Sequence, residues 1–341
     1  MSRMAISMSA LNMIGNTPMI QLSRVVSKPG GGILAKCEFM NPTGSLKDRM
    51  ALEMIVDAEQ SGKITPGFTK LVETSSGNTG ISLAAIGSIK GYDVVIVTTE
   101  DTNQEILQLL AHFGAKVILT PVGGTAFESL RTESQSLYRE KAARMVRNQI
   151  AANIVKADPS MYMLGQSTNP ANPRAHEQTG REILEQTNGK VDVFVAGIGT
   201  GGSLMGISKI LRKANPDIQI FAVEPAEATL DSVDEPTIYG IQGISDGVIP
   251  AILDLSKVNE IIRVSSAQAW HMARRLAREE GLSVGPSSGA NIWAALSVLE
   301  KVGYDHSVVT LLPDQASRYF SLGFFESDRN PVREEVSYSK N

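Results

Sequence analysis

The chain has 341 residues, 42% of them hydrophobic and 20% charged, a composition typical of a globular enzyme and a length that favours two domains. Its formal net charge of −4 provides no basic surface for nucleic acid. No apolar run approaches the ~20 residues that a membrane-spanning helix requires. We therefore expect neither nucleic acid nor a membrane as a partner.

The N-terminal sequence and the cysteine content both bear on the compartment. Residues 1–18 lack the sustained apolar core and the small-residue cleavage site of a secretion signal. The single cysteine, Cys37, cannot form an internal disulfide, which fits a reducing environment. It lies in the apolar run 33-ILAKCEF-39, where we expect it to fill a strand interior, with a reactive thiol as the alternative. A cytoplasmic location is expected.

Apolar runs of strand length alternate with helical patterns along most of the chain. Buried, β-branched strands separated by helices predict parallel sheets covered by helices on both faces, so the fold class is α/β. The segment 167-STNPANPRA-175 is expected to cross between two sheet domains. The expected strands are 33–39, 69–75, 93–99, 115–121, 191–199, 219–225 and 308–314. The expected helices lie near 47–60, 79–90, 102–113, 126–149, 174–187, 201–214, 266–280 and 288–302.

The stretch 41-NPTGSLKDRM-50 places Lys47 at the start of the first expected helix. The positive end of the helix dipole repels a lysine at this position. Taken alone, Lys47 is explained as a solvated surface charge, with Ser45 as N-cap and Asp48 completing a capping box. A chemical role for Lys47 needs support from other parts of the sequence.

Three loops rich in glycine and hydroxyl groups join expected strands to expected helices. The first, 74-TSSGNTG-80, is a dense group of hydrogen-bond donors that suits a substrate carboxylate, and simple N-capping by Ser76 or Asn78 is the alternative. The last, 285-GPSSGAN-291, opens the helix near 288–302, and one of its serines is expected to cap that helix. Loops of this kind usually line the crevice at the carboxyl ends of parallel strands.

The second loop, 197-GIGTGGS-203, could hold a phosphate at a helix N-terminus. With Glu224 at the end of the next strand, its glycines also fit a dinucleotide site, which would make the protein a nicotinamide- or flavin-dependent oxidoreductase. A plain tight turn is the remaining alternative. The hydroxyls of Thr200 and Ser203 favour an isolated, enclosed phosphate instead. Together, a phosphate loop, a carboxylate loop and Lys47 indicate pyridoxal phosphate, whose aldehyde needs a lysine for its Schiff base.

Six motifs together carry a family resemblance. In order, they are NPTGSLKDR, TSSGNTGI, QSTNPANPRAHEQTGREI, VDVFVAGIGTGGSLMG, IQGISDGVIP and GPSSGAN. From about Leu11 to about Ser327 the chain resembles the cysteine synthase (O-acetylserine sulfhydrylase) and cystathionine β-synthase family. This family belongs to the fold-type-II, tryptophan-synthase-β-like enzymes that depend on pyridoxal phosphate.

The resemblance implies a role for each matching position. Lys47 matches the Schiff-base lysine, Asn78 the contact to the ring hydroxyl of the cofactor, and Ser287 the serine that faces the pyridine nitrogen. The phosphate cradle is Gly199, Thr200, Gly201, Gly202 and Ser203, and the α-carboxylate of the substrate is held by Ser75, Ser76, Thr79 and Gln166. No metal site is implied.

The resemblance also implies the domain organisation, with two three-layer α/β domains and the cofactor in the cleft between them. Residues 1–12 and 40–160 would form the N-terminal domain, including a mobile segment at about 94–140. Residues 13–39 and 161–327 would form the C-terminal domain, followed by a polar tail at 328–341. A homodimer and a serine-acetyltransferase-type partner are implied as well.

The implied reaction is β-replacement on an activated L-serine through an aminoacrylate intermediate. Formation of L-cysteine and acetate from O-acetyl-L-serine and sulfide is the leading activity. Cystathionine β-synthase or a diaminopropionate-type synthase, which would use O-phosphoserine or serine with an amino-acid or thiol nucleophile, is the alternative. A non-catalytic binding protein of the same fold is a further possibility.

Four departures from the family pattern concern the substrate. The carboxylate loop has Ser75 where threonine is usual, and 99-TTEDTNQEIL-108 adds acidic groups near the expected entrance. Asp246 replaces a small residue, and the helical stretch at 126–158 is longer than usual. These differences favour a larger, polar nucleophile. If they are instead neutral sequence drift, sulfide stays the expected nucleophile.

Overall fold

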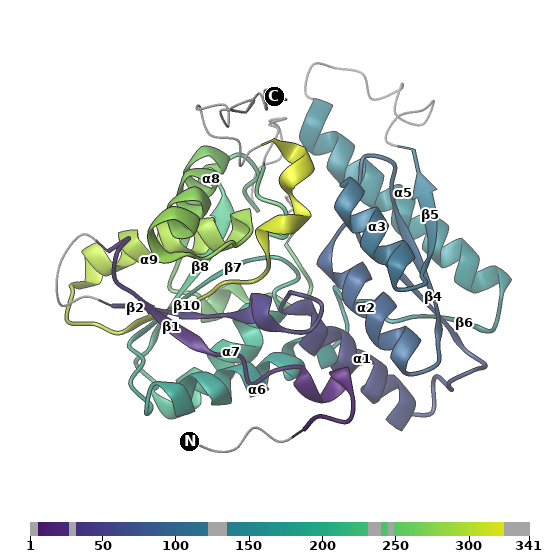
Figure 1. Ribbon diagram of the computed structural model, residues 1–341, viewed down its shortest axis with the longest axis horizontal. Coiled ribbons are helices and arrows are strands. Elements are labelled where there is room, and N and C mark those ends of the chain that lie inside the picture. The colour runs from purple at the N-terminus through teal and green to yellow at the C-terminus, as the bar shows by residue number, and fades with distance from the viewer. Residues whose placement is uncertain (1–5, 27–31, 122–134, 231–239, 245–248, 324–341) are drawn as a thin grey trace, which may run out of the picture.

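The computed structural model describes residues 6–26, 32–121, 135–230, 240–244 and 249–323. These residues form two sheets, each with helices on both faces (Figure 1). Asp246, residues 126–134 of the long helical stretch and the tail at 328–341 lie outside the described residues.

The larger sheet has six strands in the order β1-β2-β10-β7-β8-β9. The pair β1 and β2 is antiparallel, with Met19 opposite Lys36, and the other neighbours are parallel. Its strands are β1 (Met19–Leu22), β2 (Ile33–Lys36), β7 (Val193–Gly197), β8 (Gln219–Pro225), β9 (Glu260–Val264) and β10 (Val308–Leu311).

Helices cover both faces of the larger sheet because successive strand residues point to opposite sides. On β7, Val193 and Val195 pack into the core under α8 and α9, while Phe194 and Ala196 pack into the core under α6 and α7 (Figure 1). The helices are α6 (Ala171–Gln186), α7 (Gly202–Ala214), α8 (Ser266–Arg275) and α9 (Pro286–Val302), and a π-helical turn, Leu276–Glu280, continues α8.

The smaller sheet is fully parallel, in the order β5-β4-β3-β6. Val94 and Ile96 of β4 pack in the core formed with α1, α2 and α3, and Val95 and Val97 face α5. Its strands are β3 (Lys70–Thr74), β4 (Asp93–Thr99), β5 (Lys116–Thr120) and β6 (Met161–Met163). Its helices are α1 (Lys47–Gln60), α2 (Asn78–Ile89), α3 (Gln104–His112) and α5 (Gln135–Ala157).

The expected α/β class is confirmed, and each of the seven expected strands overlaps an observed one. The sequence reading missed β1, β6 and β9, each of which lies at the edge of a sheet. Edge strands pack on fewer sides, so these short strands keep half-buried and exposed residues and lack a continuous apolar run.

The chain leaves the smaller sheet after β6 and enters the larger sheet at β7, so 167–175 crosses between them as expected. Short 3-10 helices, Ala10–Met13, Glu38–Met40, Leu255–Lys257, Ala316–Arg318 and Phe320–Leu322, complete the described elements. The strands 19–36 pair in the larger sheet, and the exact limits of the two domains remain predictions.

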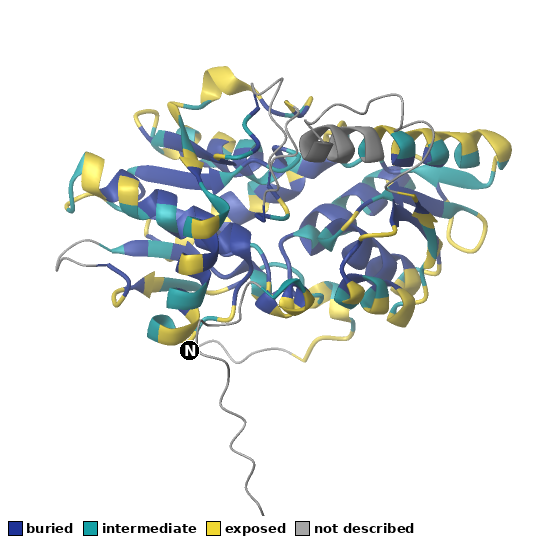
Figure 2. Ribbon diagram, turned by 90° about the horizontal axis from the view of Figure 1, so that it is seen from above, coloured by how far each residue is buried: buried dark blue, intermediate teal, exposed yellow. Residues whose placement is uncertain are grey.

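Cys37 is buried directly after β2, and burial raises the pKa of its thiol to about 11. A thiol with this pKa is protonated near neutral pH, so Cys37 fills space as expected, one residue beyond the strand itself. Figure 2 shows the buried residues concentrated along the sheets and the exposed residues on the outer surfaces. In the described part of the chain, every helix is too short or too polar to cross a membrane.

A buried ion network joins α1 to the elements of the larger sheet. Arg49 of α1 donates to both carboxylate oxygens of Glu38, at 2.7 and 2.8 Å, and to both of Glu182 on α6, at 2.7 Å each. Lys36 of β2 contacts Glu182 at 2.8 Å. All of these side chains are at most about 5% exposed. The network fixes the position of α1, two residues after Lys47, against the larger sheet.

Candidate active site

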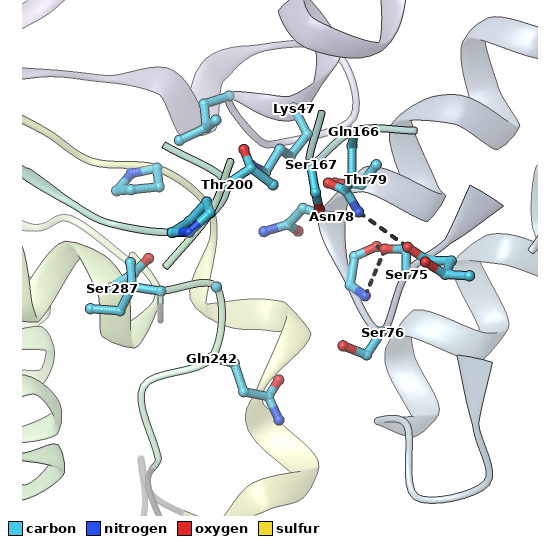
Figure 3. A pocket seen from close by; sticks show the side chains of 18 of the residues that line it. Lys47, Ser75, Ser76, Asn78, Thr79, Gln166, Ser167, Thr200, Gln242 and Ser287 are labelled. Carbon is cyan, nitrogen blue, oxygen red and sulfur yellow. Dashed lines mark hydrogen bonds between the residues drawn. The ribbon is translucent and has the colours of Figure 1, made fainter. Parts of the chain in front are cut away.

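A cavity of about 620 Å³ opens between the two sheets. Its walls come from the start of α1, the β3–α2 loop, the β7–α7 loop and the start of α9. Figure 3 shows labelled side chains from these segments gathered around one space. Ten of the residues expected at a site line it: Lys47, Ser75, Ser76, Asn78, Thr79, Gln166, Gly199, Thr200, Ser203 and Ser287.

Lys47 is half-buried at the first position of α1. Its backbone N–H donates to the Ser45 hydroxyl at 3.3 Å, but Asp48 does not complete the expected capping box. The Asp48 carboxylate accepts from the backbone N–H of Thr43 at 2.7 Å, from the Thr43 hydroxyl and from the Ser82 hydroxyl at 2.6 Å. Asp48 therefore links the start of α1 to the preceding turn and to α2, next to Lys47, which lines the cavity.

Burial lowers the pKa of Lys47 to about 8, although Asp314 opposes this effect by attracting the ammonium group. At pH 7 roughly a tenth of this lysine is therefore the neutral amine, against well under a thousandth of a solvated lysine. Only the neutral amine can attack an aldehyde or accept a proton from carbon.

We expect the reaction of cofactor-free protein with pyridoxal phosphate to accelerate with rising pH, with a midpoint near 8. A fully solvated lysine would give a midpoint near ~10.4. Rapid-mixing absorbance would measure the rate. In Asp314→Asn the midpoint should fall further, since the attraction that raises the pKa of Lys47 is lost. An unchanged or higher midpoint in the variant would contradict the role of Asp314.

The loop between β3 and α2 is organised by the hydroxyl of Ser75. It accepts from the backbone N–H groups of Gly77 at 3.2 Å and Gly80 at 3.0 Å. The N-cap residue of α2 is Gly77, so the simple capping by Ser76 or Asn78 is not observed. Thr79 donates to the Gln166 side chain at 2.7 Å, and Gln166 donates to the Thr74 carbonyl at 3.1 Å. The hydroxyls and the Gln166 amide are thereby held together at one helix N-terminus, an arrangement that suits an anion.

The loop between β7 and α7 has a conformation and packing that require glycine at the start of a helix. Gly201 has φ +85, a left-handed conformation that favours glycine. A Cβ at Gly199 would lie 2.8 Å from the Gly243 carbonyl, and a Cβ at Gly202 would lie 1.8 Å from Oδ1 of Asn172. Asn172 donates to the Thr200 hydroxyl at 2.8 Å. These glycines allow close approach of the backbone, which fits a phosphate group at the N-terminus of α7.

The side chain of Asn78 is fixed by residues from the far end of the chain. Its Nδ2 donates to Asp314 at 2.6 Å, and its Oδ1 accepts from Arg318. Tyr319 also donates to Asp314, and Asp314, Arg318 and Tyr319 are at most 2% exposed. Asn78 also lines the cavity, and an amide at this place suits the ring hydroxyl of a cofactor.

Gly201 and Gly202 shape the turn of the β7–α7 loop without lining the cavity. Sequence reasoning missed several lining residues, namely Arg144, Arg147, Asn148, Gln242, Asn291 and Tyr319. The i, i+3 spacing of the two arginines on one helix was the available signal. The acidic residues expected near the entrance are absent from the lining, and Glu105 instead accepts from the backbone N–H and hydroxyl of Ser321, at 2.7 and 2.6 Å.

Comparison with known proteins decides between pyridoxal phosphate and a nicotinamide cofactor. Residues 10–314 match the family model described as "Pyridoxal-phosphate dependent enzyme". A cysteine synthase of Staphylococcus aureus is 40% identical over 317 residues, which cover 92% of this chain and 96% of that protein. The chain belongs to the cysteine synthase family of pyridoxal-phosphate-dependent enzymes. The resemblance and the expected cofactor are confirmed, and the nicotinamide alternative is excluded.

Other similar proteins include a cysteine synthase of known structure and a cystathionine beta-synthase. The crystal structure of a cysteine synthase from Entamoeba histolytica matches with a TM-score of 0.86 and 32% identity, over 97% of this chain and 94% of that one. A cystathionine beta-synthase of Apis mellifera is 38% identical over 318 residues, 91% of this chain and 60% of that protein. The fold-type-II architecture is therefore confirmed.

Proposed function

We propose that this protein makes L-cysteine and acetate from O-acetyl-L-serine and sulfide. The observation that carries the proposal is that Lys47, the Ser75–Thr79 loop and the Gly199–Ser203 loop meet at one cavity. Each group matches a different need of this chemistry, namely an amine, a carboxylate holder and a phosphate holder. The cysteine synthase of Staphylococcus aureus supports this choice within the family.

The residues of the chain would divide the work as follows. The hydroxyls and backbone N–H groups at 75–79, with Gln166, hold the α-carboxylate and so orient the Cα–H bond of the substrate. The loop at 199–203 holds the cofactor phosphate, Asn78 its ring hydroxyl and Ser287 its pyridine nitrogen. When bound, the cofactor withdraws electrons from the substrate Cα. Lys47, whose pKa burial lowers to about 8, takes the Cα proton as general base.

The serine at position 287 bears on the reaction type. A hydroxyl cannot keep the pyridine nitrogen protonated as a carboxylate would, so the ring is a weaker electron sink. Loss of a β-substituent is then favoured over reactions that need a long-lived carbanion. This supports β-replacement as the reaction class.

The test is to incubate holoprotein with O-acetyl-L-serine and sulfide and to measure cysteine. Rapid cysteine formation is expected, with kcat/KM in the ordinary enzyme range of about 10⁴ M⁻¹s⁻¹ or more. O-phospho-L-serine and L-serine replace the donor in parallel reactions, and homocysteine or glutamate replaces sulfide. Efficient turnover only with another donor and nucleophile would reject cysteine synthesis, and no turnover with any pair would favour a binding protein.

We also infer a homodimer in the cytoplasm, with a serine-acetyltransferase-type protein as a partner. The family resemblance supports the dimer and the partner. The single, buried, reduced Cys37 is compatible with the compartment. Light scattering of the purified chain would measure the oligomeric state.

A further inference from the structure

Asn172, the second residue of α6, contacts two segments of the cavity wall. It is 1% exposed and is not among the residues that line the cavity. Its side-chain nitrogen Nδ2 donates to the backbone carbonyl of Gln166 at 2.8 Å and to the hydroxyl of Thr200 at 2.8 Å. Gln166 and Thr200 both line the cavity (Figure 3). One buried amide therefore joins two walls of the site.

The two walls belong to different sheets. Gln166 is fixed to the smaller sheet, because its backbone N–H donates to Glu73 at 3.1 Å and its side chain donates to the Thr74 carbonyl at 3.1 Å. Thr200 lies between β7 and α7 of the larger sheet. The two hydrogen bonds of Asn172 therefore set the position of the loop at 199–203 relative to Gln166.

Two ordinary roles do not account for Asn172. A side chain that caps a helix accepts, through its oxygen, from an N–H of the first turn. The Oδ1 of Asn172 is buried, and the described residues supply no hydrogen-bond donor to it. If Asn172 only filled space, an apolar residue of this size would avoid the cost of that unpaired oxygen. The amide orientation is nevertheless defined, since the Gln166 carbonyl can only accept and so must face the nitrogen.

Close packing of α6 on α7 holds the amide in place. A Cβ at Gly202 would lie 1.8 Å from Oδ1 of Asn172, and a Cβ at Gly206, one turn further along α7, would lie 2.1 Å from the Pro173 carbonyl. Glycine at both positions lets the start of α6 approach the N-terminus of α7. Asn172 is thereby held beside the helix end at which a phosphate group fits.

The contact with Asn172 determines what the Thr200 hydroxyl can do. An amide N–H only donates, so the Thr200 oxygen is the acceptor in this hydrogen bond. The single proton of the hydroxyl is then left for a different acceptor, and Thr200 lines the cavity. A hydrogen bond from a hydroxyl to an ionised oxygen is stronger than one between neutral groups. Asn172 therefore prepares Thr200 to donate to an anion.

We propose that Asn172 is a positioning residue, which holds the Thr200 hydroxyl as a donor to the cofactor phosphate and keeps that donor in register with Gln166. The role at Gln166 rests on the proposed function, in which Gln166 helps to hold the substrate carboxylate. The role at Thr200 rests on the pyridoxal phosphate of the family. Asn172 acts through these two residues, so cofactor affinity should depend on it through Thr200 and amino-acid affinity through Gln166.

The first measurement is the dissociation constant of pyridoxal phosphate in wild type, Asn172→Ala, Thr200→Val and the double variant. Each single substitution should weaken binding about 10- to 100-fold, the usual effect of losing a hydrogen bond to a charged group. The double variant should bind about as weakly as the weaker single variant, because both substitutions remove the same contact. Losses that multiply in the double variant would overturn the action of Asn172 through Thr200.

Phosphorus NMR of the holoproteins gives a spectroscopic readout of the same contact. The resonance of the bound phosphate should move in the same direction in Asn172→Ala and Thr200→Val. Thr200→Ser keeps the hydroxyl and should restore both the wild-type resonance and, within about threefold, the wild-type affinity. A wild-type resonance in Asn172→Ala would contradict the proposed hold on Thr200.

The second measurement is the dissociation constant of L-serine, taken from the absorption spectrum of the holoproteins at saturating cofactor. Asn172→Ala should weaken L-serine binding about 3- to 10-fold, because Gln166 loses a hydrogen bond, whereas Thr200→Val should change it less than about twofold. Unchanged binding in Asn172→Ala would overturn the link to Gln166. The measurement needs no turnover, so a failure of cysteine synthesis would leave its result standing.

Asn169→Ala is the matched control, because Asn169 supports the same connection through the Leu164 carbonyl, at 2.8 Å, and the Ala171 N–H, at 2.9 Å. It should keep both dissociation constants within about threefold, and losses as large as those of Asn172→Ala would assign the effect to general folding of the connection. If Asn172→Ala does not fold, Asn172→Asp keeps the shape without the donors. Thr200→Val then remains decisive, since wild-type cofactor affinity in that variant would overturn the proposal.

Discussion

Lys47→Ala is expected to remove the visible absorption band of the bound cofactor and to lower kcat about 10³-fold or more. The substitution deletes both the amine that bonds the cofactor aldehyde and the general base, and a general base alone typically contributes 10²- to 10⁴-fold, on the order of that loss. The neighbouring holders of phosphate and carboxylate stay in place. The substrate and cofactor should therefore still bind, and the loss should be in kcat.

The measurement combines an absorption spectrum of the purified variant with a cysteine assay. Lys63→Ala is the matched control, because Lys63 is an exposed lysine just beyond the end of α1. It should keep both the spectrum and the activity. A Lys47→Ala protein that retains the visible band and turns over normally would show that another amine holds the cofactor.

The sequence alone left Lys47 between two explanations. Its position at a helix start is compatible with a capped, solvated surface residue, and only the glycine-rich loops at 74–80 and 197–203 pointed to chemistry. The structure supports only part of the explanation of Lys47 as a capped surface charge. Ser45 does contact the backbone of Lys47, but Asp48 is used elsewhere, so half of the expected capping box exists.

The central strands were predictable because burial on both faces produces continuous apolar runs. Three of the four edge strands, β1, β6 and β9, were missed because they are short or interrupted by polar residues, whereas the edge strand β5 was found from its apolar run at 115–121. The strand-to-helix loops were found since their glycines and hydroxyls are adjacent in sequence. The supports of Asn78 were missed because Asp314 and Arg318 lie 236 and 240 residues away along the chain.

Arg144 and Arg147 of α5 were missed for the same reason, because their place in the cavity wall depends on long-range packing. A basic stretch on a helix is usually a solvated face, and its sequence does not say that the face meets the end of β3. The departure noted at 126–158 was therefore visible, but its consequence for the cavity depended on the contact between Asn148 and Thr74. Long-range packing decided which polar side chains became part of the site.

Arg49→Met is expected to cost about 3–5 kcal/mol of unfolding free energy, the typical loss when one partner of a buried ion network is removed. The methionine fills a similar volume but leaves Glu38 and Glu182 without the guanidinium that pairs with both. Equilibrium denaturation with urea would measure the change. Because α1 begins at Lys47, cofactor affinity should fall together with stability.

The matched control is Arg174→Met, which also removes an arginine between α6 and α1. Arg174 is 44% exposed and contacts Glu53 and Asp57 at the surface. Solvent screening limits such pairs to roughly 0–1 kcal/mol, so the control should retain nearly all of its stability. Equal losses of unfolding free energy in the two variants would contradict a larger stabilising role for the buried Arg49 network.

Acid provides a second test of the same network. Burial alone would raise the pKa of Glu182, but the hydrogen bonds and charge of Arg49, with a hydrogen bond from Lys36, outweigh it and hold this pKa at about 2, below the ~4.3 of an unfolded chain. A carboxyl group with a lowered folded-state pKa contributes fully above the unfolded value and loses that contribution as pH falls through the folded one. Wild-type stability should therefore decline between about pH 4 and 2. In Arg49→Met the pKa of Glu182 rises, so the difference between the proteins should shrink across that window, and a constant difference would contradict the assigned pairing.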